Sequence, residues 1–174
     1  MPCVKNTEFN LYDHQKEALG KLHSGAILFG DVGSGKTLTG LAFYLKHYSD
    51  RDLYVVTTAK KRDSGDWEEE ALLLGINNLV VDSWNNIRRY CEIRNAFFIF
   101  DEQRVVGSGA WSKYFVRIGK TNEWILLSGT PGDTWMDYIP VFLANRYYKN
   151  KTEFIHMHVE YDRMVKFPKV KRYH

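Results

Sequence analysis

Residues Gly30–Thr37 (GDVGSGKT) have the side chains and the spacing that suit binding of a triphosphate. They match G-x-x-x-x-G-K-[ST], the Walker A or P-loop pattern. Glycines in such a loop let backbone N–H groups close around phosphate oxygens, and the following helix adds the positive end of its dipole. We expect the Lys36 ammonium to reach the β and γ phosphates and the Thr37 hydroxyl to ligate Mg²⁺. The residues expected to contact the nucleotide are Gly30, Asp31, Val32, Gly33, Ser34, Gly35, Lys36 and Thr37.

Two adjacent acids, Asp101 and Glu102, directly follow the buried-strand pattern Ala96–Phe100. An apolar run that leads into an acid is the Walker B arrangement. We expect Asp101 to complete the Mg²⁺ shell opposite Thr37, and Glu102 to polarise the attacking water. Together with Lys36, these acids are the predicted catalytic residues, and ATP with Mg²⁺ is the predicted cofactor pair.

Further polar residues follow other apolar runs. Thr58, Lys60 and Lys61 come after Leu53–Thr57, where hydroxyls and cations suit a phosphodiester backbone, although a solvated loop explains them equally well. Ser128–Thr130 follows another run and is interpreted either as a γ-phosphate sensor or as an ordinary turn. Upstream, the Gln15 amide offers the donor and acceptor that an adenine edge requires, but a surface glutamine is the simpler interpretation.

The elements that must position these residues follow from the apolar pattern. Runs of strand length are Ala26–Phe29, Leu53–Thr58, Asn78–Asp82, Ala96–Phe100 and Trp124–Leu127. Segments with helical spacing lie between them, and strands that alternate with helices predict a three-layer α/β domain with a mainly parallel sheet and helices on both faces. Ligands bind at the carboxyl ends of strands in such sheets, which is where the polar residues fall.

Length and composition limit the alternatives. The chain has 174 residues, enough for one domain with a full core, and its net charge of +3 permits nucleic-acid binding without requiring it. No apolar stretch approaches a membrane span, and Cys3 and Cys91 form no metal-binding pattern. We therefore expect a cytoplasmic protein with reduced thiols and no membrane partner.

The C-terminal part is less informative. Glu153–Val159 alternates like a strand, with His156 and His158 on one face, but the lack of a third ligand nearby argues against a metal site. Residues 160–174 are basic and aromatic with little periodicity. We expect a lobe over residues 1–159 and a linker over residues 160–174.

Four segments occur in one order: Leu11–Gln15, Gly30–Thr37, Asp101–Arg104 and Ser128–Pro131. This series resembles the first RecA-like lobe of superfamily 2 helicases, most closely that of Swi/Snf-like DNA translocases and especially their compact bacteriophage-encoded versions. The resemblance covers roughly Leu11 to Val159. It would place the protein in the host cytoplasm if the gene is carried by a phage, with a role in DNA replication or remodelling.

The resemblance also implies roles for individual residues. Gln15 would read adenine, and Trp67 and Glu70 stand as in the Swi/Snf pattern. The residues implied to contact the DNA backbone are Thr58, Lys60, Lys61, Ser83 and Trp84. Those implied to couple hydrolysis to movement between lobes are Arg104, Ser128, Gly129 and Thr130. Arg104 departs from the family, which usually has His there.

Members of this family carry a second RecA-like lobe with an arginine finger, and nothing after Thr152 supplies one. Arginine fingers contribute about 10³–10⁵ in rate in P-loop enzymes. We therefore expect an ATP-dependent helicase or translocase lobe that hydrolyses ATP weakly alone, with duplex DNA and a second lobe, in cis or in trans, as partners. Two alternatives remain open: a nucleotide-gated adaptor for DNA or a replication protein, and a small P-loop metabolite kinase.

Overall fold

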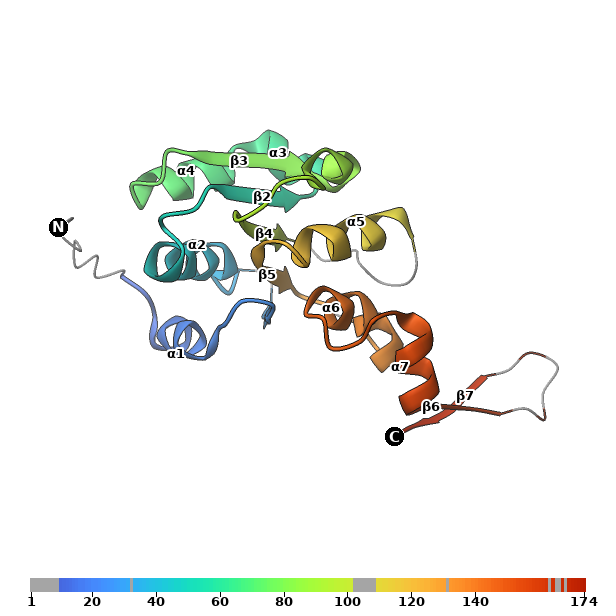
Figure 1. Cartoon of the computed structure of the whole chain (residues 1–174). Helices are drawn as coiled ribbons and strands as arrows, with labels where there is room; N and C mark the ends of the chain where they lie inside the picture. The colour runs from blue at the N-terminus through green and yellow to red at the C-terminus, as the bar shows by residue number, and fades with distance from the viewer. Residues whose placement is uncertain are drawn as a thin grey trace.

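The structure is a computed structural model that describes residues 10–31, 33–101, 109–130, 132–162, 164, 167 and 169–174. Within these residues, five strands pair in parallel in the order β1-β5-β4-β2-β3 (Figure 1). The strands are β1 (Ile27–Phe29), β2 (Leu53–Thr57), β3 (Leu79–Ser83), β4 (Phe97–Asp101) and β5 (Glu123–Ser128). Each lies within one residue of its predicted bounds, and the predicted α/β class is confirmed.

Helices cover both faces of the sheet (Figure 1). The α-helices are α1 (Asp13–Lys21), α2 (Lys36–His47), α3 (Ala59–Ser64), α4 (Asp66–Leu73), α5 (Ala110–Gly119), α6 (Ile139–Ala144) and α7 (Lys151–His158), and the 3₁₀ helices are η1 (Trp84–Tyr90) and η2 (Trp135–Tyr138). Side chains of α1, α2 and α4 pack into one apolar core, while those of η1, α5 and α6 pack into another.

The central strand β4 shows why two cores form. Phe97 and Ile99 belong to the core under α2, whereas Phe98 and Phe100 belong to the core under α5, and all of these side chains are fully buried. Because successive strand residues point to opposite faces, a strand between two helical layers must be apolar throughout. The apolar run therefore places Asp101 at the carboxyl end of β4, in the middle of the sheet.

Helix α1 begins at Asp13 with Tyr12 as its N-cap, and the Gln15 side chain accepts a hydrogen bond from the Tyr12 amide at 2.9 Å. One element prediction, the strand pattern at Glu153–Val159, is wrong. Residues 151–158 form helix α7 instead of a strand, because Asn150 caps the helix by accepting from the Glu153 amide at 2.9 Å. Positions i and i+2 lie about 200° apart on a helix, so His156 and His158 do not share a ligand.

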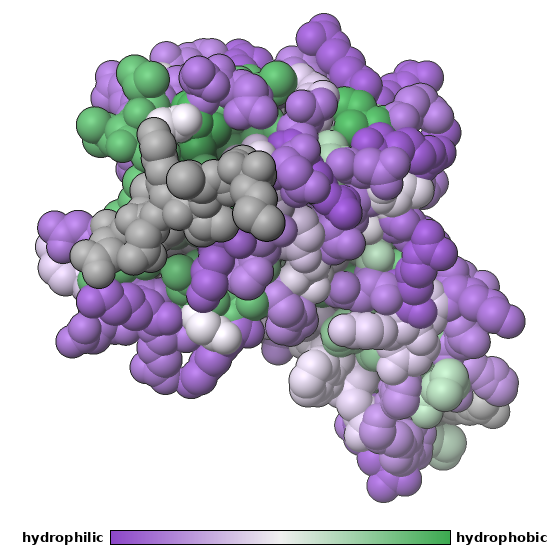
Figure 2. Space-filling model, turned by 60° about the vertical axis from the view of Figure 1, so that its left-hand side comes forward, coloured by the Kyte–Doolittle hydropathy of each residue, from purple (hydrophilic) through white to green (hydrophobic). Residues whose placement is uncertain are grey.

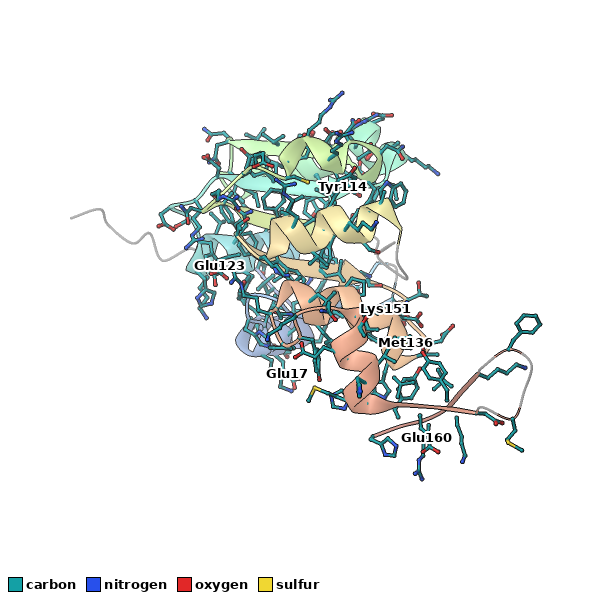
Figure 3. The ribbon with its side chains drawn as sticks, turned by 45° about the vertical axis from the view of Figure 1, so that its right-hand side comes forward. Glu17, Tyr114, Glu123, Met136, Lys151 and Glu160 are labelled. Carbon is teal, nitrogen blue, oxygen red and sulfur yellow. The ribbon has the colours of Figure 1, made fainter. Side chains whose placement is uncertain are left out.

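The C-terminal residues form a hairpin where an irregular linker was expected. β6 (Val159–Asp162) and β7 (Lys169–Tyr173) pair antiparallel and project from the body beyond α7 (Figure 1). Glu160 accepts from Lys171 at 3.2 Å and from Arg172 at 2.5 Å. Figure 3 shows Glu160 on this hairpin, on the far side of α7 from Tyr114 of α5.

The face seen in Figure 2 is mostly hydrophilic, with hydrophobic groups in small separate areas. No helix in the described part of the chain combines the length and the apolar character needed to cross a bilayer.

Candidate nucleotide site

A cavity of about 700 Å³ lies at the edge of the sheet where the strands end. It is lined by Asp31, Gly33–Thr37, Asp101 and Leu127–Thr130, together with Lys61 and Glu70. Small-molecule sites commonly measure about 300–1,000 Å³. The structure thus brings the predicted P-loop, Walker B and strand-end residues into one cavity, although they are far apart in sequence.

The P-loop enters helix α2 through Gly35. Gly35 has φ +74° and forms the N-cap, a backbone conformation that a residue with a Cβ adopts only with strain. A Cβ at this position would also lie 2.0 Å from Gln15 Nε2. Glycine is therefore the residue that permits this turn. The N–H groups of Lys36 and Thr37, in the first turn of α2, are at the cavity.

The Lys36 ammonium lies folded over its own loop. Its Nζ donates to the Gly30 carbonyl at 2.5 Å and to the Asp31 carbonyl at 2.7 Å. Neutral carbonyl oxygens are weaker partners for an ammonium than phosphate oxygens are. The side chain is consequently placed to exchange these contacts for an anionic ligand in the cavity.

Asp101 is a buried carboxylate held by neighbouring elements. It is 2% exposed, and its Oδ2 accepts from Thr57 Oγ1 at 2.9 Å, Lys61 Nζ at 3.2 Å and Trp67 Nε1 at 3.3 Å. The Trp84 indole donates to its backbone carbonyl at 2.9 Å. These donors orient the carboxylate at the cavity wall.

The predicted coupling segment lies directly beside the P-loop. β5 pairs with β1, and the Gly30 amide donates to the Ser128 carbonyl at 3.2 Å. The Thr130 amide in turn donates to Ser128 Oγ at 3.1 Å. One backbone hydrogen bond thus joins Ser128–Thr130 to the first residue of the P-loop.

Gln15, the predicted adenine reader, contacts the P-loop in this structure. Its side chain is 3% exposed, and its Nε2 donates to the Gly35 carbonyl at 3.3 Å. Because its Oε1 accepts from the Tyr12 amide, both ends of the amide are engaged. In this structure Gln15 ties α1 to the P-loop, and its polarity on an otherwise apolar helix face is explained by that contact.

The residues expected to contact DNA differ in how far this structure exposes them. The Thr58 hydroxyl accepts a hydrogen bond from the Lys61 amide at 3.3 Å and thereby caps α3. Lys60 is exposed, whereas Lys61 points to Asp101. Ser83 and Trp84 are each 2% exposed, so their side chains are not available to DNA in this conformation. Of these five residues, only Lys60 is both charged and exposed, whereas Lys61 is half-buried.

Several residues of the site are not among the predicted site residues. Thr57 falls within the predicted strand, and Glu70 has a place in the Swi/Snf pattern but no predicted role. Glu70 lines the cavity, where burial raises its pKa, the nearby Asp66 charge adds to this, and Lys61 opposes it. The spacing of Trp67 and Glu70, one turn apart on α4, was the available signal, because it places both on one helix face. Val32, Glu102 and Arg104 lie outside the described residues.

The described residues fit a magnesium nucleotide. The Ser34 hydroxyl is buried and has no hydrogen-bond partner within the described part of the chain, as expected for a donor that awaits a ligand. Gly33 has φ +81°, so the loop keeps the curvature that N–H groups need to surround an anion. Thr37 and Asp101 supply oxygen atoms, and protein-bound Mg²⁺ that bridges phosphates needs only one or two such groups.

Comparison with known proteins identifies the fold. The chain matches the crystal structure of the Pyrococcus furiosus Hef helicase domain with a TM-score of 0.56 and 15% identity, over 86% of this chain and 40% of that one. The present chain thus spans less than half of the helicase domain that it resembles, and at this identity the likeness shows the fold alone. No family model matches the sequence, and no curated protein matches it. The chain has the helicase-type RecA-like fold.

Proposed function

We propose that this chain is the ATP-binding first lobe of a DNA-dependent motor of the Swi/Snf-like translocase type. The observation that carries this proposal is the convergence of the P-loop, Asp101 and Ser128–Thr130 on one cavity. A P-loop that merely caps a helix would not require a buried carboxylate and a second strand end beside it. The RecA-like fold, shared with a helicase domain, supports the same function.

In this proposal the chain's residues have distinct tasks. Lys36 leaves the Gly30 and Asp31 carbonyls and binds the phosphates, together with the N–H groups at the start of α2. Thr37 and Asp101 hold Mg²⁺, which neutralises charge on the phosphate oxygens. Glu102 positions the attacking water. Ser128–Thr130 and Arg104 relay the state of the site toward a second lobe.

The remaining assignments complete the proposal. Residues 1–159 form the lobe, and the hairpin after it leads toward a second RecA-like lobe in cis or in trans. Lys60, on the exposed side of α3, is the residue that we assign to the DNA backbone.

The test measures binding of a fluorescent ATP analogue and steady-state ATP hydrolysis, each with and without duplex DNA. We compare the parent chain with Lys36→Ala and with Lys46→Ala, which removes an exposed lysine at the other end of the same helix. We expect Lys36→Ala to weaken nucleotide binding by at least about 100-fold, corresponding to loss of a charge-assisted contact of about 3 kcal/mol, and Lys46→Ala to bind normally.

Hydrolysis that rises with DNA and disappears in Lys36→Ala supports the proposal for the chain alone. Binding without hydrolysis, followed by hydrolysis when a second lobe is added, supports it for a two-lobed motor. A parent chain that binds no ATP, or equal binding by the Lys36→Ala variant, overturns it. Tight binding with no hydrolysis beside a second lobe indicates the adaptor, and turnover that depends on a small acceptor and not on DNA indicates the kinase.

A further inference from the structure

Lys61 is a second cation in the nucleotide site, and it comes from outside the P-loop. Its Nζ lies 3.2 Å from Asp101 Oδ2, and it reaches there from the first turn of α3. Thr58 fixes the start of that helix, which directs the Lys61 side chain inward while the neighbouring Lys60 stays exposed. The ion pair therefore follows from how α3 begins after β2.

The two members of this ion pair differ in mobility. The Asp101 side chain is 3% exposed and is also held by Thr57 and Trp67, whereas the Lys61 side chain is 40% exposed. A buried carboxylate without a countercharge is unfavourable, so a cation beside Asp101 is stabilising. An ammonium with access to water leaves the site at little desolvation cost. The carboxylate is thus the fixed partner and the ammonium is the exchangeable one.

We propose that the Lys61 ammonium is a placeholder for Mg²⁺ at Asp101, neutralising the carboxylate in the nucleotide-free chain and withdrawing when a magnesium nucleotide binds. This inference rests on the proposed function, because it assumes that Asp101 belongs to the metal site. Lys61 contacts Asp101 at Oδ2, so Mg²⁺ bound to the same carboxylate would lie close to the ammonium, and two cations at that distance repel each other. In this proposal, binding of Mg²⁺ therefore displaces Lys61.

The displacement has a consequence for α3. The residue after Lys61, Arg62, donates from its guanidinium to Asp82 and to Ser83 Oγ, both at 3.4 Å, at the end of β3. Helix α3 thus links the nucleotide edge of the site to the end of the neighbouring strand. When Lys61 withdraws, the contacts of α3 change. Because α3 also carries the exposed Lys60, nucleotide binding then affects the surface that we assign to DNA binding.

The test is the melting temperature of the full chain without nucleotide, in EDTA and in millimolar MgCl₂ at matched ionic strength. We expect the parent to melt at the same temperature in both conditions, because Lys61 already neutralises Asp101. Lys61→Met should melt about 5 °C or more below the parent in EDTA and regain at least half of this loss in MgCl₂. The control Lys60→Met makes the same charge change on the same helix and should stay within about 1 °C of the parent in both conditions.

Further variants keep the inference falsifiable if Lys61→Met does not fold. Lys61→Gln removes the charge but keeps a donor for Asp101, and it should also gain stability from MgCl₂. Lys61→Arg keeps the charge and should behave as the parent, while Lys61→Met with Asp101→Asn should lose the response to MgCl₂. The inference is overturned if Lys61→Met and Lys61→Gln respond to MgCl₂ no more than the parent does. The assay contains no ATP and no DNA, so this outcome is separate from the test of the motor function.

Discussion

Gly35 illustrates how one residue can satisfy a backbone and a packing requirement together. Its positive φ begins helix α2, and its missing side chain leaves the space in which the Gln15 amide bonds to the loop. The two requirements come from different parts of the chain, one from the turn and the other from α1. This residue therefore connects the P-loop to the first helix.

We expect Gly35→Ala to lower the free energy of unfolding by about 1–3 kcal/mol, because the added Cβ is strained at φ +74° and displaces the buried Gln15 amide. Nucleotide affinity should fall at least about tenfold, since the first N–H groups of α2 lose their orientation. Urea denaturation and binding of a fluorescent ATP analogue measure the two effects.

Gly20→Ala is the matched control for this substitution. Gly20 lies near the end of α1, and a Cβ there meets no atom within 4 Å. Alanine is the better helix former, so this variant should be up to about 1 kcal/mol more stable than the parent. A Gly35→Ala variant as stable as the Gly20→Ala variant would contradict the assigned role of Gly35.

Among the elements, η1 is held to the end of β3 by Asp82. This carboxylate accepts from Tyr90 Oη at 2.6 Å, Asn86 Nδ2 at 2.8 Å and the Ser83 amide at 2.7 Å. Burial by itself would raise the pKa of Asp82, but the hydrogen bonds from Tyr90, Asn86, Ser83 and Arg62 outweigh it and hold the pKa below its usual value. Burial and the bond to Asp82 raise the pKa of Tyr90 to about 12.

The pKa directions give the pH window of this contact. Asp82 has a lowered pKa, so its stabilisation is present above the usual value near 4 and is lost as the pH falls through the native value. Tyr90 has a raised pKa, so its stabilisation is complete below about pH 10 and is lost as the pH rises toward 12. The hydrogen bond between the two is at full strength at neutral pH.

Tyr90→Phe should lower the free energy of unfolding by about 1–2 kcal/mol at neutral pH, and the difference from the parent should shrink in acid as Asp82 is protonated. The measurement is urea denaturation at acidic, neutral and alkaline pH. Tyr147→Phe, at a tyrosine that is 64% exposed, is the control and should change stability little. A Tyr90→Phe difference that is independent of pH would show that packing, and not the bond to Asp82, is responsible.

Over the whole molecule, the two apolar cores lie on either side of the sheet, and neither includes any of the hairpin residues that the structure describes. The hairpin meets the body at its base, where the His158 ring contacts the His174 carbonyl at 2.8 Å and the Tyr148 hydroxyl at 2.8 Å. Figures 1 and 3 show it projecting past α7. The described part of the hairpin therefore packs outside the two cores.

Truncation after Val159 should leave the melting temperature within about 2 °C of the parent and the nucleotide affinity within about twofold. Differential scanning fluorimetry and nucleotide binding check both values. Leu41→Ala, at a fully buried core position, is the positive control. It should lower the free energy of unfolding by about 2–5 kcal/mol. A truncated chain destabilised as strongly as the Leu41→Ala variant would mean that the lobe extends into the hairpin.

Local sequence determined the positions of the strands, the P-loop and the acid after β4. The five apolar runs predict β1 to β5 within one residue, most clearly at β4, which is buried on both faces and needs uninterrupted apolar residues before Asp101. Gly30–Thr37 is equally local, since loop curvature and helix start depend on residues adjacent in sequence. Local patterns fail where two periods fit a short segment, as at Glu153–Val159, where a helix cap decides in favour of α7.

Only the tertiary structure decided which side chains meet in the site. The partners of Asp101 come from β2, α3 and α4, between 34 and 44 residues away in sequence, and they meet because β2 pairs with β4. The same packing brings Gln15 into contact with the P-loop and Lys61 into contact with Asp101, and it buries Trp84 in the core. Strand order and side-chain burial depend on the packing of whole layers, so a residue's type and its neighbours in sequence do not specify its partner.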